Sequence, residues 1–204
     1  GAGLRGAAGV AAAVWILLGC AQFLRGRSIG TARLNRSEGA MLLSHAGLAV
    51  FLVGAALVGA ISDETHVRLA PGERVTLAGY DFEFHGTQVV RGPNYVADQG
   101  RFTVRRDGAA AGELMPQKRR YLQGGQVMTE AAIDPGFTRD LYVSLGEPLE
   151  PASGSGGGQA WAVRVYHKPF VRWIWLGALM MMAAGLLGAS DRRLRAPAPT
   201  GDAS

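Results

Sequence analysis

The residue with the strongest chemical signal in this 204-residue chain is His45. It lies within the run MLLSHAGLAVFLVG, residues 41–54, whose other side chains are apolar or small. An ionisable side chain in a membrane span is costly unless it has a partner, so such a residue is a functional-site candidate by default. A neutral imidazole there can hydrogen-bond a neighbouring helix, relay protons, or bind a metal such as haem iron. The residue types alone leave these roles open.

The other titratable residues form weaker patterns. The sequence holds no Walker motif, nucleophile elbow, paired cysteines or His-x-x-x-His motif. His66, His85 and His167 are widely separated near the ends of expected strands, which favours solvated surface histidines over a metal cluster. The lone Cys20 forms no internal disulfide and is interpreted as a small buried hydrophobe.

A second polar cluster surrounds a Pro-Gly turn in MTEAAIDPGFTRDLYVSLGE. Its members are Thr129, Glu130, Asp134, Arg139 and Asp140. Carboxylates beside an arginine are able to serve as acid and base. A structural network of ion pairs and turn hydrogen bonds is the preferred interpretation.

The elements that position these residues are dominated by three charge-free runs, which cover 6–24, 39–62 and 173–190. A bilayer core needs about 20 helical residues, so each run is long enough to span it. We therefore predict a membrane protein with spans at 6–24, 39–61 and 169–190. Small residues at helix-turn spacing, Ala55 with Gly59 and Ala56 with Ala60, predict close helix packing in the second span.

Charge supports this topology and argues against nucleic-acid binding. Residues 62–168 hold 12 Lys or Arg against 13 Asp or Glu, so the overall charge of +5 comes from the flanks. Arginines concentrate in the 25–38 loop and in the tail at 191–204, which the positive-inside rule makes cytoplasmic. Residues 62–168 then lie outside, in a periplasm.

The region 62–168 has alternating apolar and polar residues with Gly and Pro turns, the pattern of short antiparallel strands. Expected strands cover 66–69, 74–77, 80–90, 95–106, 112–121, 126–133, 140–146 and 160–166. The glycine-rich stretch at 153–158 is expected to be a flexible hairpin loop. The predicted fold is thus a helical hairpin over 1–61, a small antiparallel β-barrel or sandwich, and a third span.

Several segments together resemble one family. MLLSHAGLAVFLVG, VRLAPGERVTLAGYDFEF, RGPNYVADQGRFTVRRDG, QKRRY, MTEAAIDPGFTRDLYVSLGEPLE and WAVRVYHKPFVRWIW occur in the order found in the C-terminal region of the CcmF/NrfE haem lyase family of cytochrome c maturation. The similarity covers most of residues 38–195. It implies a multi-pass protein of the bacterial inner membrane that works with a haem chaperone and other maturation subunits to attach haem to apocytochrome c.

The resemblance implies a role for His45 in particular. The family's HxGxAV span carries an axial ligand of an intramembrane haem b, and His45 occupies that position here. We expect the porphyrin to pack beside Met41, Leu48, Ala49 and Leu52. The second axial ligand is expected on an upstream helix outside this chain, which is therefore expected to be part of a longer protein. Quinol is the electron donor that the resemblance suggests.

Two departures limit what carries over. His167 stands where family members commonly have Tyr, and His66 where Asp is common, so neither inherits a ligand role. The 204 residues alone are expected to bind haem weakly and to lack catalysis. The alternative function is a non-catalytic membrane scaffold whose β domain docks maturation partners.

Overall fold

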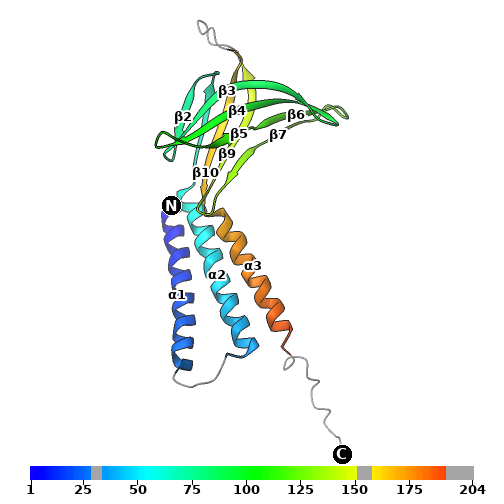
Figure 1. The fold of residues 1–204 in the computed structure, drawn as a ribbon. Helices are drawn as coiled ribbons and strands as arrows, with labels where there is room; N and C mark the ends of the chain where they lie inside the picture. Colours follow the sequence, from blue (N-terminus) through cyan, green and yellow to red (C-terminus); the bar gives the residue numbers. More distant parts are fainter. Residues whose placement is uncertain (29–33, 151–157, 192–204) are drawn as a thin grey trace, which may run out of the picture. The chain divides into compact units, whose positions relative to one another are not determined.

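The computed structural model describes residues 1–28, 34–150 and 158–191. These form two compact units, one helical (residues 1–60 and 170 onward) and one made of strands (Ile61–Pro169). Figure 1 shows the helices and strands of each unit. The predicted fold class is confirmed: three long apolar helices accompany an antiparallel β sandwich inserted between the second and the third.

The three helices are α1 (Ala2–Ser28), α2 (Arg36–Ile61) and α3 (Val171–Ala189), and each is long and apolar enough to cross a membrane. α1 extends beyond its charge-free run at both ends, and α2 and α3 begin before theirs, so Arg5, Arg25 and Arg36 lie within helical turns. A capping box starts α2: Asn35 Oδ1 accepts from the Glu38 N–H at 2.8 Å, and Glu38 Oε2 accepts from the Asn35 N–H at 3.0 Å.

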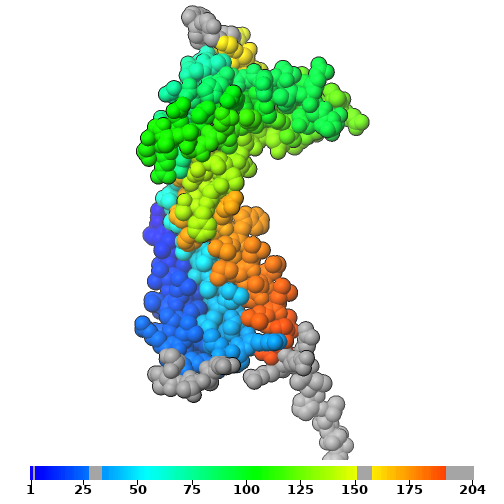
Figure 2. Space-filling model, viewed as in Figure 1, coloured from blue at the N-terminus to red at the C-terminus, as the bar shows by residue number. Residues whose placement is uncertain are grey.

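Small residues set the packing of α1 against α2. A Cβ atom added at Gly6 would lie 2.7 Å from the Ala60 Cβ, and one at Gly9 would lie 2.7 Å from the Ala56 Cβ. The Ala56 and Ala60 pair therefore makes the close contact that its spacing indicates. In Figure 2 the side chains of α1, in dark blue, lie against those of α2, in light blue.

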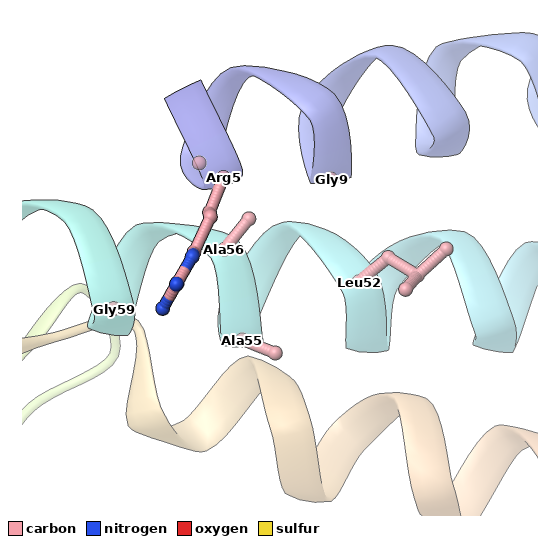
Figure 3. Close-up of a pocket in the computed structure, with 7 residues that line it drawn as sticks. Arg5, Gly9, Leu52, Ala55, Ala56 and Gly59 are labelled. Atoms are coloured by element: carbon pink, nitrogen blue, oxygen red, sulfur yellow. The ribbon is translucent and has the colours of Figure 1, made fainter. Parts of the chain in front are cut away.

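The neighbouring Ala55 and Gly59 line an open groove instead. Figure 3 shows Arg5 reaching from α1 toward Gly59 on α2, with Leu52 two turns farther along the groove. At the opposite end of the pair, Arg27 Nη1 lies 2.7 Å from Glu38 Oε1. Glycine contacts and a charged pair thus fix the antiparallel alignment of α1 and α2.

The contact between α2 and α3 is closer still. A Cβ atom at Gly177 would lie 2.5 Å from both Gly47 O and Phe51 N. One at Gly54 would lie 2.9 Å from Ile174 N. Glycine is required at these positions because the two backbones touch directly.

The described residues of the strand unit form ten antiparallel strands: β1 (Asp63–Leu69), β2 (Arg74–Leu77), β3 (Tyr80–Arg91), β4 (Tyr95–Arg106), β5 (Ala109–Leu114), β6 (Gln117–Tyr121), β7 (Val127–Glu130), β8 (Ala132–Pro135), β9 (Arg139–Leu149) and β10 (Ala160–Pro169). One sheet has the order β1-β10-β9-β8. The other has the order β2-β3-β4-β6-β7, with β5 also paired to β4. Figure 1 shows β3 and β4 as the long strands of this second sheet.

The core of the strand unit lies between the two sheets. Phe82, Phe84 and Phe102 are fully buried, and the rings of Phe84 and Phe102 stack with centroids 4.8 Å apart. Leu141 and Val165 cover them from the other sheet. In β3 and β4 alternate residues around these rings point inward, as the period-2 pattern predicts.

Two predicted strands are wrong in extent. The strand expected at 112–121 is divided at Met115-Pro116, where Pro116 has no N–H to donate; β5 and β6 pair with successive halves of β4. The strand expected at 126–133 is divided at Ala131, where the chain passes from one sheet to the other. The expected loop at 153–158 and the tail after 191 lie almost entirely outside the described residues.

Candidate functional site

His45 lies on α2 with its side chain exposed at the surface of the helical unit. Its Nδ1 lies 2.8 Å from the carbonyl oxygen of Met41, one turn earlier on the same helix. A carbonyl only accepts hydrogen bonds, so a neutral His45 carries its proton on Nδ1. The lone pair is then on Nε2, on the side of the ring away from the Met41 carbonyl. Metal-binding histidines have this arrangement, with one ring nitrogen donating a hydrogen bond and the other free to bind.

A groove of about 370 Å³ lies beside this imidazole. Met41 and His45 line it from α2, and the other lining residues all come from α1: Trp15, Ile16, Gly19, Cys20 and Phe23. This volume is at the lower end of what ligand pockets enclose. The groove is therefore a mainly apolar surface beside the imidazole, formed by residues of both α1 and α2.

The structure corrects the expected surroundings of His45. Met41 does line the groove beside it. Ala49 is only 1% exposed, so it is covered by protein and cannot face a ligand. Leu52 lines the separate groove at the Arg5 end, and Leu48 is not part of the His45 groove. The sequence pattern of α2 alone does not reveal that most residues lining this groove come from α1.

The prediction that Cys20 is a buried hydrophobe is also corrected. It is half-buried and lines the groove rather than being enclosed in a core. Its neighbours in the groove were not identified as candidates, because aromatic and small residues in a span are ordinary. The spacing of Trp15, Gly19 and Phe23, four residues apart on one helix face, is the signal that marks them.

The three histidines of the strand unit are not brought together. His66 and His85 are exposed, and His85 Nε2 hydrogen-bonds the Thr103 hydroxyl at 2.8 Å. His167 is half-buried instead of solvated: its ring stacks on Tyr80 with centroids 6.2 Å apart. Within the described residues no cluster of three or more His, Cys, Asp or Glu side chains is arranged to hold a metal ion.

The polar residues around the Pro135-Gly136 turn form paired contacts. Asp134 Oδ2 lies 2.6 Å from Arg139 Nη1, and the buried Asp140 accepts a hydrogen bond from the Gly136 N–H at 3.0 Å. Glu130 contacts Arg119 at 3.3 Å on another strand. Each carboxylate has a structural partner, which favours the network interpretation over an acid–base site.

Sequence reasoning missed the centre of this network, Tyr80. Its hydroxyl accepts hydrogen bonds from Arg139 Nε at 3.1 Å and from Arg106 Nη1 at 3.0 Å. Both guanidinium carbons lie 5.1 Å from the ring centroid. A tyrosine at the start of an alternating strand is an ordinary core residue, so nothing in the sequence links it to two arginines.

Charge and burial shift two pKa values here. Burial lowers the pKa of Arg139, but hydrogen bonds to Tyr80 and Asp134 outweigh it, so the net shift is upward. Burial lowers the pKa of His167 most, and the positive charges of Arg139 and Arg106 lower it further, while Asp63 opposes them. Folding therefore disfavours the protonated form of His167.

Comparison with known proteins supports the resemblance. A family model described as the CcmF C-terminal beta-sandwich matches residues 60–169, which include the whole strand unit. The chain is 46% identical over 192 residues to the cytochrome c-type biogenesis protein CcmF of Pseudomonas aeruginosa. It is 45% identical over 188 residues to CcmF of Escherichia coli (strain K12). A more distant relative, NrfE of Haemophilus influenzae, is 33% identical over 161 residues.

The matched lengths define how much of these proteins the chain represents. The two CcmF alignments cover 91% and 92% of this chain but only 28% of each relative. The NrfE alignment covers 79% of this chain and 24% of that protein. A solved structure titled Cytochrome c Heme Lyase CcmF has the same fold, with a TM-score of 0.73 and 14% identity over 88% of this chain and 29% of that one. This chain belongs to the CcmF family of cytochrome c-type biogenesis proteins.

Proposed function

We propose that this chain is the part of a haem lyase subunit that supplies one axial ligand, His45, to a haem b within the membrane. The observation that supports this role is the hydrogen bond from His45 Nδ1 to Met41 O at 2.8 Å. It fixes the tautomer, leaves Nε2 free to bind iron, and orients the ring toward an apolar groove.

The residues present fit one side of a haem site. His45 would hold the iron through Nε2, and the Met41 carbonyl would increase the basicity of that nitrogen by accepting from Nδ1. The aromatic and aliphatic groove residues would exclude water from the ring faces. When bound, haem would supply one-electron transfer. Since His45 is the only histidine in residues 1–60 and 170–204, a second histidine ligand would come from elsewhere in the protein.

The wider role is proposed from the family. The relatives are named for cytochrome c-type biogenesis. We propose that the complete protein lies in the bacterial inner membrane, with residues 62–168 in the periplasm. There it would receive haem from a haem chaperone and, with other maturation subunits, attach it to apocytochrome c. Quinol would donate electrons through the membrane haem.

Haem content of the full-length protein tests the proposal. Purified His45→Ala protein should lose the b-type absorbance that depends on this ligand, whereas Ser44→Ala, which removes the polar group of the preceding residue, should keep it. An unchanged spectrum in His45→Ala, with equal haem per polypeptide, would reject the ligand role. A stable six-coordinate low-spin spectrum from residues 1–204 alone would reject the need for a second ligand elsewhere.

The proposed orientation is tested separately by cysteine labelling in intact cells. A cysteine introduced at Asp107 should react with an impermeant maleimide, and one at Arg33 should react only after the cells are lysed. Equal labelling at both positions would contradict a periplasmic strand unit.

A further inference from the structure

We infer that α1 forms the second wall of the haem site, and that Gly19 is the point where the porphyrin lies against the α1 backbone between Trp15 and Phe23. This inference rests on the proposed haem role of His45 and adds residues that this role does not require. It concerns positioning, because none of the three side chains ligates the iron.

The alignment of the helix pair places Gly19 beside His45. Gly6 lies against Ala60 and Gly9 lies against Ala56, so α1 and α2 run antiparallel. Continuing that alignment brings residues 20 and 21 level with His45, directly after Gly19. The groove contacts agree, since Gly19 and Cys20 line the same groove as the imidazole.

The shape of α1 at this level is a notch between two aromatic rings. Trp15, Gly19 and Phe23 are spaced four residues apart and so lie in one row along the helix. A Cβ atom added at Gly19 would meet no other atom within 4 Å, so this glycine is not needed for the contact with α2. Gly6 and Gly9, by contrast, are needed for it. The row from Trp15 to Phe23 rises about 12 Å along the helix, so the notch would give a flat macrocycle an extended apolar surface.

Trp15 gives independent support. It is the middle residue of α1 and is 79% exposed in the helical unit. Tryptophan in membrane proteins is enriched at the two interfaces, where its indole N–H meets water or headgroups. In the middle of a span the N–H needs a polar partner and the ring needs a surface to cover. A haem in the groove provides an extended ring surface next to it.

Substitution in the notch tests the inference in the full-length protein. Gly19→Leu would fill the notch, and we expect haem per polypeptide to fall at least fivefold, whereas Gly19→Ala should lower it less than twofold. Gly185→Leu on α3 is the matched control, because a Cβ there also meets nothing within 4 Å, and it should keep full haem content. Equal amounts of each protein in the membrane exclude a folding defect.

The outcomes separate this inference from the proposed function. If His45→Ala keeps its haem, the proposed function fails. If His45→Ala loses haem while Gly19→Leu keeps it, only the α1 wall is wrong. A loss of haem in both Gly19→Leu and Gly185→Leu would also overturn the inference, because the effect would not be specific to the notch.

Cys20 provides a second readout that does not depend on a substitution in the notch. It is the chain's one cysteine and lines the groove, so its reaction with a small membrane-permeant maleimide reports on what covers that wall. Labelling of this residue, followed by peptide mass analysis, should be about tenfold slower in haem-loaded wild type than in haem-free His45→Ala. Equal rates would show that the haem does not lie against α1.

Discussion

The contact between α2 and α3 predicts that two glycine-to-alanine substitutions on α3 affect stability differently: one should destabilise the protein and the other should not. At Gly177 an added Cβ would lie 2.5 Å from two backbone atoms, Gly47 O and Phe51 N. Contacts under 3.0 Å do not occur for real Cβ atoms, and backbone atoms cannot rotate away as a side chain can. Gly177→Ala must therefore push α3 away from α2 by several tenths of an ångström.

The magnitude follows from two opposing effects. Replacing glycine by alanine inside a helix is favourable by up to about 1 kcal/mol when the site is open. Overpacking of a close contact costs about 1–3 kcal/mol. Gly185→Ala, which has open space around its Cβ, should then be neutral or slightly stabilising. Gly177→Ala should be net destabilising, by up to about 2 kcal/mol once the gain in helix propensity is subtracted.

Reversible unfolding of the purified protein in mild detergent, titrated with a denaturing detergent, measures both variants against wild type. The midpoint should shift to lower denaturant for Gly177→Ala and stay constant or rise for Gly185→Ala. If the two variants shift by the same amount in the same direction, the close backbone contact does not determine the stability of this helix pair.

Two further predictions concern the strand unit, studied as an isolated Ile61–Pro169 fragment by urea unfolding. Phe84→Ala should cost about 3–5 kcal/mol because a fully buried ring is removed, whereas Val89→Ala, at 68% exposure, should cost less than about 0.5 kcal/mol; similar losses would contradict the assigned core. The pKa of His167 is lower in the folded state than in the unfolded state, where it is about 6.5. The contribution of His167 to the free energy of unfolding is therefore present above the unfolded-state pKa and is lost as the pH falls through the folded-state pKa. His167→Gln should thus lose less stability than wild type between pH 7 and pH 5, and parallel pH profiles would refute this.

The sequence predicted the elements well where one strong physical constraint acts. A charge-free run of about 20 residues has few structural alternatives to a long apolar helix. The alternation of apolar and polar residues likewise agrees with the burial of Phe82, Phe84 and Phe102. The errors arose where pairing between distant strands decides the limits of a strand. At Ala131, for example, no local sequence feature shows that the chain passes from one sheet to the other.

The candidate site was predictable only in part for a related reason. His45 is conspicuous because its ionisable ring is rare in an apolar run. Trp15, Gly19 and Phe23 become candidates only when the alignment of α1 on α2 is known, and that alignment depends on contacts between separate helices. Similarly, the grouping of Arg106 and Arg139 at Tyr80 requires three strands to meet.

The pairing of β1 with β10 has a consequence for cooperativity. Asp63 lies opposite His167, so the strands that follow α2 and precede α3 are direct neighbours. Bringing together two points separated by about a hundred residues costs on the order of 4 kcal/mol of chain entropy. The β1–β10 pairing and the α2–α3 contact both bring together the two ends of the segment between α2 and α3. Whichever forms first therefore removes most of the entropic cost of forming the other. Two units with separate cores are thereby coupled through the chain itself, and a substitution that loosens one also reduces the stability of the other.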